Sequence, residues 1–325
     1  MPSTGDWKVP PIAQPKAEGY KFDLDRALGA VVALTAQVPD DAFTAETLGT
    51  ERVGHGVVIR ESGLVLTIGY LITEAEQVWL RLSDGKVVPG HALAYDHESG
   101  FGLVQALGRL DVTPLPLGRA ADALVGEHAI VAAAGGRHRS VAARIVARQE
   151  FAGYWEYLLD DALFTAPAHP NWGGTGLINA AGELIGIGSL HLEQRQDPDT
   201  VFHVNMMVPI DRLLPVLDDL LAYGRPNRPP RPWLGLYATE LDDQLAVVGV
   251  AAGGPAQIAD VQAGDVVLTV AGQPVTSLAE LFRAVWALGD AGVEVPLTVL
   301  REGRMLALRV VSGDRMKFLK SPRLH

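Results

Sequence analysis

The sequence predicts a mainly β protein of two domains, a larger all-β domain followed by a small α+β domain. Short β-type runs separated by turn signals recur regularly before residue 225, and 35 glycines are spread along the 325-residue chain. Glycine in this abundance is typical of tight turns between short strands rather than of a helical bundle. The segment Arg225–Pro232 holds four prolines in eight residues, which removes backbone donors and predicts a stiff, extended connector.

The first domain is predicted to be a β-barrel or β-sandwich that ends in a helix. Asp84-Gly85 is a strong hairpin signal, and regularly spaced strands of this kind favour a barrel or sandwich. Leucines recur at helical spacing within Asp211–Tyr223, and Gly224 is placed to end that helix. The expected strands are Gly56–Arg60, Leu64–Thr67, Gln77–Leu82, Lys86–Pro89, Val125–Ala133, Val141–Arg148, Leu158–Thr165, Leu184–Leu190 and Val201–Val208.

The second domain is predicted to be a small sheet with one amphipathic helix. Strands are expected at Val247–Ala251 and Val266–Val270. A hairpin is expected to join Val293–Leu300 to Met305–Val311. Ser277 is a suitable N-cap, and the residues after it form one apolar helix face. That face consists of Leu278, Leu281, Phe282, Val285 and Trp286.

The composition limits the classes of function. The formal net charge of −11, from 27 basic and 38 acidic residues, disfavours nucleic acid and acidic membrane surfaces as partners. The chain has no cysteine, which excludes disulfides, cysteine nucleophiles and thiolate metal sites. Its nine histidines lack the His-Glu-x-x-His spacing, so we expect no metal and no cofactor.

The N-terminal sequence is polar and proline-rich and lacks the charged-then-apolar pattern of a signal peptide. The apolar run Leu28–Thr35 is far too short to cross a bilayer. We therefore expect no membrane span and a cytoplasmic protein, or a periplasmic one if a leader was removed.

The second domain carries four short motifs in a fixed order. They are Trp233-Leu234-Gly235-Leu236, Gly254-Pro255-Ala256, Ala263-Gly264-Asp265-Val266-Val267 and Ala271-Gly272-Gln273-Pro274-Val275. Together they resemble the permuted PDZ domain of HtrA proteases, in which the carboxylate-binding strand comes first. The resemblance implies that a peptide adds as a strand beside Leu234, Gly235 and Leu236, its C-terminal carboxylate held by backbone donors. Leu281 and Val285, on the helix Leu278–Leu288, would line the other wall. Core packing is the alternative role for Trp233 and Leu236.

The first domain carries further motifs of the same family. They are Gly54-His55-Gly56-Val57-Val58-Ile59, Gly63-Leu64-Val65-Leu66-Thr67, Leu80-Arg81-Leu82-Ser83-Asp84-Gly85-Lys86, Gly182-Glu183-Leu184-Ile185-Gly186-Ile187 and Met207-Val208-Pro209-Ile210. This similarity to HtrA proteases, over roughly residues 25–312, implies a chymotrypsin-like double β-barrel followed by a PDZ domain (α+β). The expected divisions are a flexible segment 1–24, a protease-fold domain 25–224, a linker 225–232, a PDZ domain 233–312 and a basic, solvated tail 313–325.

The family's catalytic motifs match positions that hold other residues here. Tyr70, in Leu66-Thr67-Ile68-Gly69-Tyr70, stands where the family has its general base, and Gly102 stands where it has the orienting aspartate. Counting back from Asn179 places Gly173 at the nucleophile, whereas counting forward from Asn171 places Trp172 there.

The residues at these positions lack the chemistry of acyl transfer. That reaction needs a hydroxyl, a base that accepts its proton near neutral pH, and a carboxylate that orients the base. A tyrosine has a pKa of about 10, glycine has no side chain, and the indole of tryptophan only donates. In a subtilisin-type triad, losing the nucleophile or base alone costs on the order of 10⁶ in turnover. The resemblance therefore predicts an inactive HtrA-like pseudoprotease.

Other interpretations stay open at this point. Thr175 and His169 would restore a hydroxyl and a base if they met, although a loop shift of two residues moves a side chain several times the ~1 Å that catalysis tolerates. The turn Gly173-Gly174 would offer backbone donors to a carbonyl without reacting. The aromatic cluster Tyr154, Trp155 and Tyr157 is either a recognition patch or ordinary strand packing.

The function predicted from these residues is a non-catalytic scaffold that binds peptide or unfolded-protein C-termini through its PDZ groove. A serine-type endopeptidase with an unusual active site is the alternative, and a structural subunit whose groove is filled is a third. Assembly is open between a homo-oligomer and pairing with an active relative.

Overall fold

The computed structural model describes residues 7–197 and 200–320. The chain divides into two compact units. The first unit holds, of these residues, 7–149 and 161–226, and the second unit holds Glu150–Asp160 and Asn227–Lys320. The division after Pro226 falls within the proline-rich segment. The short stretch Glu150–Asp160 belongs to the second unit, although sequence position alone would give it to the first.

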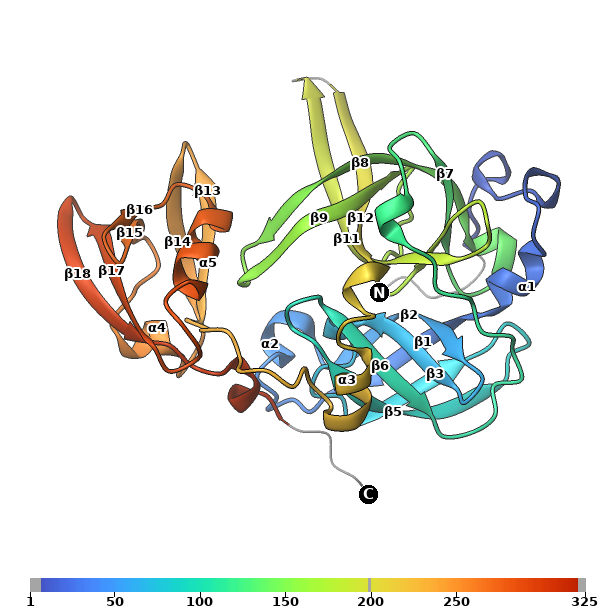
Figure 1. The fold of residues 1–325 in the computed structure, drawn as a ribbon, viewed down its shortest axis with the longest axis horizontal. Helices are drawn as coiled ribbons and strands as arrows, with labels where there is room; N and C mark the ends of the chain where they lie inside the picture. Colours follow the sequence, from blue (N-terminus) through green and yellow to red (C-terminus); the bar gives the residue numbers. More distant parts are fainter. Residues whose placement is uncertain (1–6, 198–199, 321–325) are drawn as a thin grey trace. The chain divides into compact units, whose positions relative to one another are not determined.

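The first unit contains two closed six-stranded barrels (Figure 1). The strand order of the first barrel is β1-β2-β3-β6-β5-β4, with every ladder antiparallel. Its interior is filled by side chains such as Leu34, Leu66 and Phe101, which are fully buried. Its strands are β1 (Val31–Gln37), β2 (Glu51–Arg60), β3 (Leu64–Ile68), β4 (Gln77–Arg81), β5 (Val87–Tyr95) and β6 (Phe101–Ala106).

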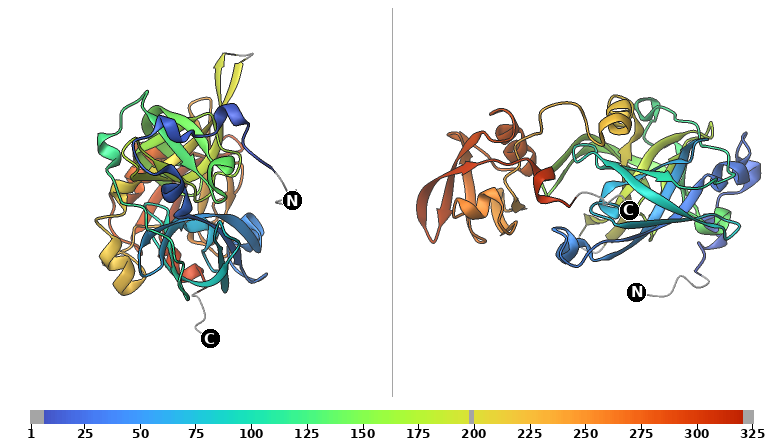
Figure 2. Two further views of the ribbon diagram at one scale, coloured as in Figure 1. Left: turned by 90° about the vertical axis from the view of Figure 1, so that its right-hand side faces the viewer. Right: turned by 90° about the horizontal axis from the view of Figure 1, so that it is seen from below.

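The second barrel has the order β10-β11-β12-β9-β8-β7. The hairpin of β11 and β12 continues past the barrel wall and stands out from it in Figure 1 and in the left view of Figure 2. The strands are β7 (His128–Ala132), β8 (Val141–Gly153), β9 (Tyr157–Ala166), β10 (Gly176–Ile178), β11 (Leu184–Asp197) and β12 (Thr200–Pro209). The mainly β, double-barrel fold is thereby confirmed.

The predicted helix Asp211–Tyr223 is shorter in the structure. α3 spans only Leu217–Tyr223, preceded by the 3₁₀ turn η6 (Ile210–Arg212). Pro215 lies between them, and a proline has no N–H for an intrahelical hydrogen bond. Gly224 ends α3 in the left-handed conformation, with φ of 72°, as predicted. The other short helices of the first unit are η1 (Pro11–Ala13), η2 (Ala17–Gly19), α1 (Leu24–Gly29), α2 (Ala45–Leu48), η3 (Gly69–Leu71), η4 (Ala120–Asp122) and η5 (Gly136–Arg139).

The segment expected to be flexible, 1–24, has defined contacts from residue 7 onward. Val9 is buried and its N–H donates to the carbonyl of His138 at 2.8 Å. The ring of Trp7 meets the His169 ring edge-on at 5.5 Å between centroids. Residues 1–6 lie outside the described part of the chain.

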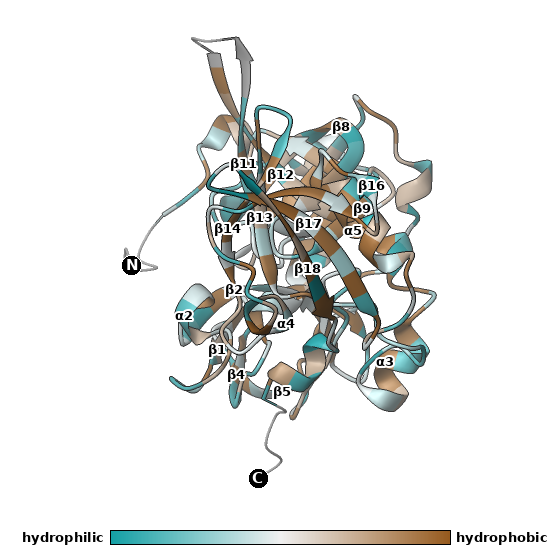
Figure 3. Ribbon diagram, turned by 90° about the vertical axis from the view of Figure 1, so that its left-hand side faces the viewer, coloured by the Kyte–Doolittle hydropathy of each residue, from teal (hydrophilic) through white to brown (hydrophobic). Residues whose placement is uncertain are grey.

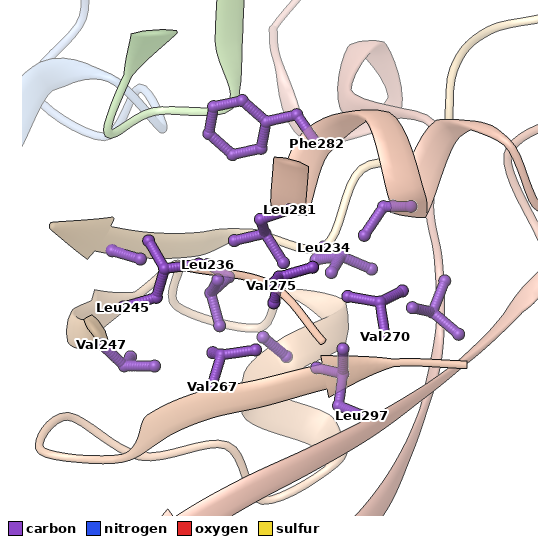
Figure 4. Close-up of a cluster of buried hydrophobic side chains, with 14 of the residues drawn as sticks. Leu234, Leu236, Leu245, Val247, Val267, Val270, Val275, Leu281, Phe282 and Leu297 are labelled. Atoms are coloured by element: carbon purple, nitrogen blue, oxygen red, sulfur yellow. The ribbon is translucent and has the colours of Figure 1, made fainter. Parts of the chain in front are cut away.

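The second unit is a sheet of order β13-β14-β15-β17-β18, with β16 paired to β15. Ser277 begins α5 (Leu278–Trp286) with a reciprocal capping box to Glu280, which confirms the predicted N-cap. Buried side chains of α5 and the sheet form one core cluster (Figure 4). Along β18 (Arg304–Val311), which carries both hydrophobic and hydrophilic residues (Figure 3), more exposed and less exposed residues alternate from Met305 to Val311. The remaining elements are β13 (Leu236–Leu241), β14 (Gln244–Val250), α4 (Pro255–Ile258), β15 (Val266–Val270), β16 (Gln273–Pro274), β17 (Glu294–Arg301) and β18 (Arg304–Val311).

The tail after β18 is only partly the solvated end that was expected. It forms the 3₁₀ turn η7 (Arg315–Phe318), and Gly313 exchanges two backbone hydrogen bonds with Trp233. The Phe318 ring packs on the Trp233 ring at 4.7 Å between centroids. Residues 321–325, including Arg323, lie outside the described residues.

Candidate functional site

Tyr70 links the two barrels of the first unit. It lies in η3, directly after β3, and its hydroxyl donates to the carbonyl of Ser189 on β11 at 2.9 Å. The side chain of Trp172 also hydrogen-bonds to Tyr70, with the indole as the donor. Burial raises the pKa of Tyr70 well above its ordinary value of 10. The phenol therefore stays protonated and serves as a structural donor.

Gly173 lies directly beside that phenol. A Cβ built on Gly173 would be 2.8 Å from the hydroxyl oxygen of Tyr70. The residues predicted at the base and nucleophile positions thus come together, and the phenol occupies the space into which a side chain at position 173 would project. The carbonyl of Gly173 accepts a hydrogen bond from the backbone N–H of His55 at 2.9 Å.

Gly102 packs against the same turn from β6. It pairs with Thr67 of β3, and a Cβ built on it would be 2.9 Å from both the Cα of Gly69 and the Cδ1 of Ile72. A Cβ essentially never approaches another heavy atom this closely, and here one of the two atoms belongs to the backbone. Any side chain at position 102 therefore requires the turn that carries Tyr70 to move.

Trp172, the other residue predicted at the nucleophile position, lies in an aromatic stack. Its ring stacks on His191 at 5.4 Å and 18°, and His191 stacks on His203 at 4.9 Å and 9°. Both residues predicted at the nucleophile position thus lie against Tyr70. Gly173 does so with its backbone, and Trp172 does so as an indole donor.

Thr175 and His169 are engaged separately. The Thr175 hydroxyl donates to the carbonyl of Trp172 at 2.8 Å. The Nε2 of His169 lies 2.6 Å from the carbonyl of Arg139, so Nε2 carries the proton, and Nδ1 accepts from the N–H of Asn171 at 3.0 Å. Burial lowers the pKa of His169. Each group has its own partner in this arrangement.

The backbone N–H of Gly174, in the turn Gly173-Gly174, is not available as the free donor that the sequence analysis expected. The N–H of Gly174 donates to the carbonyl of Gly188 at 2.9 Å and is therefore already used. Gly174 has φ of 76°, and a Cβ there would overlap the carbonyl oxygen of His55. The hypothesis of an anion-binding turn is wrong for this amide, because the turn folds inward against β2 and β11.

The ring of His55 is a buried polar group that the sequence patterns did not single out. Its Nδ1 accepts from the N–H of Ala134 at 3.2 Å, and its Nε2 has no hydrogen-bond partner among the described residues. Burial, with a smaller contribution from His169, lowers the pKa of His55 to about 3. The ring is therefore neutral near pH 7.

In the second unit, three backbone amides converge on one carboxylate. The N–H groups of Leu234, Gly235 and Leu236 donate to Oε1 of Glu156 at 3.2, 2.7 and 3.1 Å, and that of Leu234 also reaches Oε2 at 3.1 Å. Gly235 has φ of 69°, which a residue with a side chain rarely adopts. We call residues 234–236 the carboxylate loop.

Burial raises the pKa of Glu156 to about 7. The loop amides and the positive charge of Arg315 act in the opposite direction but do not cancel the effect of burial. Glu156 lies within the aromatic cluster Tyr154, Trp155 and Tyr157, but no periodicity or motif in the sequence marked the glutamate itself.

The other residues predicted to bind peptide are buried in the second unit. Trp233 is 4% exposed and packs on Phe318, which is the core-packing role considered for it. Leu281 and Val285, on α5, are 1% and 2% exposed within the core cluster, where Figure 4 shows Leu281 among the labelled side chains.

Within the aromatic cluster, Trp155 stacks on Tyr157 at 5.6 Å, whereas Tyr154 is half-exposed and meets the ring of Tyr237 edge-on. Among residues 7–197 and 200–320, no three histidine, aspartate or glutamate side chains are grouped so that they could hold a metal ion. No helix in the same ranges has the length and hydropathy needed to span a bilayer.

Two family models match the chain, a trypsin-like peptidase domain over residues 54–187 and a PDZ domain over residues 232–311. The two barrels and the separate sheet-and-helix unit agree with this order. The chain therefore belongs to the HtrA-like family, in which a trypsin-like peptidase domain is followed by a PDZ domain.

Among curated proteins, the chain is similar to the serine endoprotease DegS of Salmonella typhimurium, with 25% identity over 335 residues that cover 93% of this chain and 90% of DegS. It is 28% identical over 276 residues to a probable periplasmic serine endoprotease, DegP-like, of Pseudomonas fluorescens. That match covers 81% of this chain but 56% of the relative, so the chain spans about half the length of the DegP-like proteins.

Among solved structures, the HtrA-type protease AlgW with a tripeptide matches with a TM-score of 0.53 and 21% identity, over 95% of this chain and 99% of AlgW. At this identity the match supports the fold.

Proposed function

We propose that this protein is a non-catalytic HtrA-like pseudoprotease that acts as a peptide- or protein-binding scaffold. The observation that carries the proposal is the position of the Tyr70 phenol. It lies where a nucleophile at position 173 would project and is held by the Ser189 carbonyl. A protonated phenol with a raised pKa has no capacity to accept a proton from a nucleophile near pH 7.

The packing around Gly102 supports the same proposal. An orienting carboxylate at this position would overlap Gly69 and Ile72. The three substitutions are therefore fitted to one another, because the small residue at 102 lets the turn with Tyr70 pack closely on β6. Single reversions are not expected to rebuild a triad.

The binding half of the proposal rests on the carboxylate loop of the PDZ domain. Three convergent amides suit the C-terminal carboxylate of a peptide, and β13 begins at Leu236, where an added strand would pair. The tripeptide is bound in the structure of AlgW, and we extend peptide binding to this chain by analogy. C-termini of peptides or unfolded proteins are the proposed partners, in protein quality control.

An activity assay tests the catalytic half. Purified full-length protein is incubated with fluorogenic casein and, separately, with a fluorophosphonate probe, next to an active HtrA protease. We expect neither cleavage nor labelling. Cleavage that disappears in the Thr175→Val variant would instead support the alternative function, a serine-type endopeptidase with a non-standard site.

A binding assay tests the other half. Decapeptides with randomised last four residues are immobilised through their N-termini, once with a free carboxylate and once amidated. We expect selective capture of the protein by free-carboxylate peptides. Equal capture by both sets would contradict recognition of C-termini.

The compartment and the assembly belong to the same proposal. The word "periplasmic" in the names of the DegP-like relatives favours the periplasm over the cytoplasm first expected for this chain. A regulator of this kind would form a homo-oligomer or pair with an active relative. Fractionation of the native host and light scattering of the purified protein test these two points.

A further inference from the structure

The segment Glu150–Asp160, which we call the hairpin tip, consists of the end of β8, the turn Tyr154–Glu156 and the start of β9, and it belongs to the second unit. Leu158 of the tip is 7% exposed and is one of the residues of the core cluster that includes Leu281 and Phe282 of α5. Ala152 packs against the same cluster. A segment that comes from the second barrel in sequence thus completes the hydrophobic core of the PDZ domain.

Polar contacts from two elements of the second unit and a ring contact from a third hold the hairpin tip. Arg283 of α5 forms ion pairs with Glu150 and with Asp160, the latter at 2.7 Å. From η7, Arg315 donates to the carbonyl of Trp155 at 3.1 Å. From β13, the ring of Tyr237 meets the Tyr154 ring at 6.1 Å between centroids. The tip therefore lies against β13 and α5, the two elements between which a peptide is expected to bind.

Glu156 extends from the tip into the carboxylate loop. Its backbone has φ of 61°, in the left-handed region that residues other than glycine seldom adopt. This conformation accompanies a carboxylate whose Oε1 accepts all three loop amides, with the closest contact at 2.7 Å. A second carboxylate has no room on the same donors, since each N–H of the loop is already directed at Glu156.

We propose that Glu156 is an internal ligand of the PDZ domain, so that its side-chain carboxylate takes the place of a peptide C-terminus and closes the groove until the hairpin tip is displaced. This inference rests on the proposed peptide-binding function and names its regulation. The peptide and the tip compete for the same three amides. If the tip leaves the loop in about one molecule in ten or fewer, the apparent Kd for a peptide is raised at least about tenfold.

The first measurement needs no peptide. Amide hydrogen exchange of residues 234–236 is followed in the full-length protein and in the Glu156→Gly variant, in which glycine suits the left-handed backbone and removes the acceptor. The matched control is Glu302→Gly, at an exposed glutamate with φ of 49° in another turn of the second unit. We expect at least about tenfold faster exchange of the loop amides in Glu156→Gly and wild-type exchange in Glu302→Gly.

The second measurement uses the tightest free-carboxylate decapeptide from the library, labelled with fluorescein, in an anisotropy titration. We expect Glu156→Gly to bind it at least about tenfold more tightly than wild type. Arg283→Ala, which releases the tip without touching the loop, is expected to shift affinity in the same direction. Thermal unfolding checks that each variant is folded.

The outcomes separate this inference from the proposed function. Equal exchange rates of the loop amides in wild type and Glu156→Gly overturn the proposal of an internal ligand, independently of the peptide titration. Protected amides together with no peptide binding by any variant support the internal ligand and contradict the peptide-binding function. Equal peptide affinity of wild type and both release variants contradicts the competition.

Discussion

The hydroxyl of Tyr70 donates to the carbonyl of Ser189 at 2.9 Å and thereby joins the end of β3 in one barrel to β11 in the other. Ser189 is 3% exposed, so its carbonyl depends on a protein donor. The residue predicted at the general-base position thus forms a structural connection between the barrels.

The first prediction concerns this hydrogen bond. Tyr70→Phe keeps the ring but leaves the Ser189 carbonyl without that donor, so we expect the free energy of unfolding of the first unit to fall by about 1–3 kcal/mol. Urea denaturation followed by tryptophan fluorescence measures it. Tyr20→Phe, which changes a half-buried tyrosine in the N-terminal segment, serves as the control. A Tyr70→Phe protein as stable as wild type would show that the bond contributes nothing.

The second prediction concerns Gly102. Gly102→Ala places a methyl group 2.9 Å from Gly69 and Ile72, and overpacking of this kind typically costs about 1–3 kcal/mol. Gly29→Ala is the matched control, because a Cβ there meets nothing within 4 Å. In thermal unfolding, we expect a Tm below that of wild type for Gly102→Ala but not for Gly29→Ala. Equal melting of the two variants would mean that position 102 has room for a side chain.

The third prediction is a pH dependence of peptide binding. The pKa of Glu156 is raised by burial from 4.5 to about 7, so the loop-bound carboxyl holds its proton more tightly than a displaced one. Lowering the pH through this window therefore stabilises the closed groove, and raising it weakens the closed groove. A peptide α-carboxylate, with a pKa of about 3.5, stays ionised throughout.

We therefore expect the affinity of the labelled decapeptide to rise between about pH 5 and about pH 8 in wild type and to stay flat in Glu156→Gln. The other titratable groups around the carboxyl are Arg315, Tyr237 and Tyr154, residue types that do not ordinarily change charge in this range. Two results would contradict Glu156 as the titrating group. One is a decapeptide affinity that falls with rising pH in wild type, and the other is the same dependence of affinity on pH in Glu156→Gln as in wild type.

The fourth prediction concerns Arg301 and Asp265 in the second unit. The Asp265 side chain is fully buried and pairs with Arg301 at 2.7 Å, and this guanidinium lowers the pKa of the carboxyl. Arg301→Ala leaves the carboxylate buried without its cation, which costs about 3–5 kcal/mol.

Arg309→Ala, which removes an exposed pair with Glu294, is the control and is expected to cost at most about 1 kcal/mol. In wild type the contribution of Asp265 is present above the ordinary carboxyl pKa and is lost as the pH falls through the lowered value. Denaturant midpoints of the second unit at several pH values measure both effects, and similar losses in the two variants would refute the prediction.

Much of the fold followed from local sequence patterns. Alternating apolar residues, turn signals and the capping residue Ser277 are local features, and most predicted strands and the start of α5 agree with the structure. β10 was missed because Gly176–Ile178 is too short to show alternation, and β8 was cut at Arg148 because its continuation to Gly153 leaves the barrel core.

The residues of the candidate site could likewise be predicted only in part from the sequence. Tyr70, Gly102 and Gly173 could be proposed from the sequence because a family resemblance supplied their positions, and their assignment to a catalytic triad stays a prediction. Glu156 was not found, because its partners lie 78 to 80 residues further along the chain and no local pattern encodes such a contact.

The assignment of Glu150–Asp160 to the second unit bears on how far the PDZ domain is a separable module. Within the described residues the polypeptide passes between the units after Gln149, after Asp160 and after Pro226. A fragment cut at the proline-rich segment would lose Leu158 together with the glutamate, and so would be both less stable and permanently open. Exchange of this domain with that of a relative would succeed only if the eleven residues from the second barrel travelled with it.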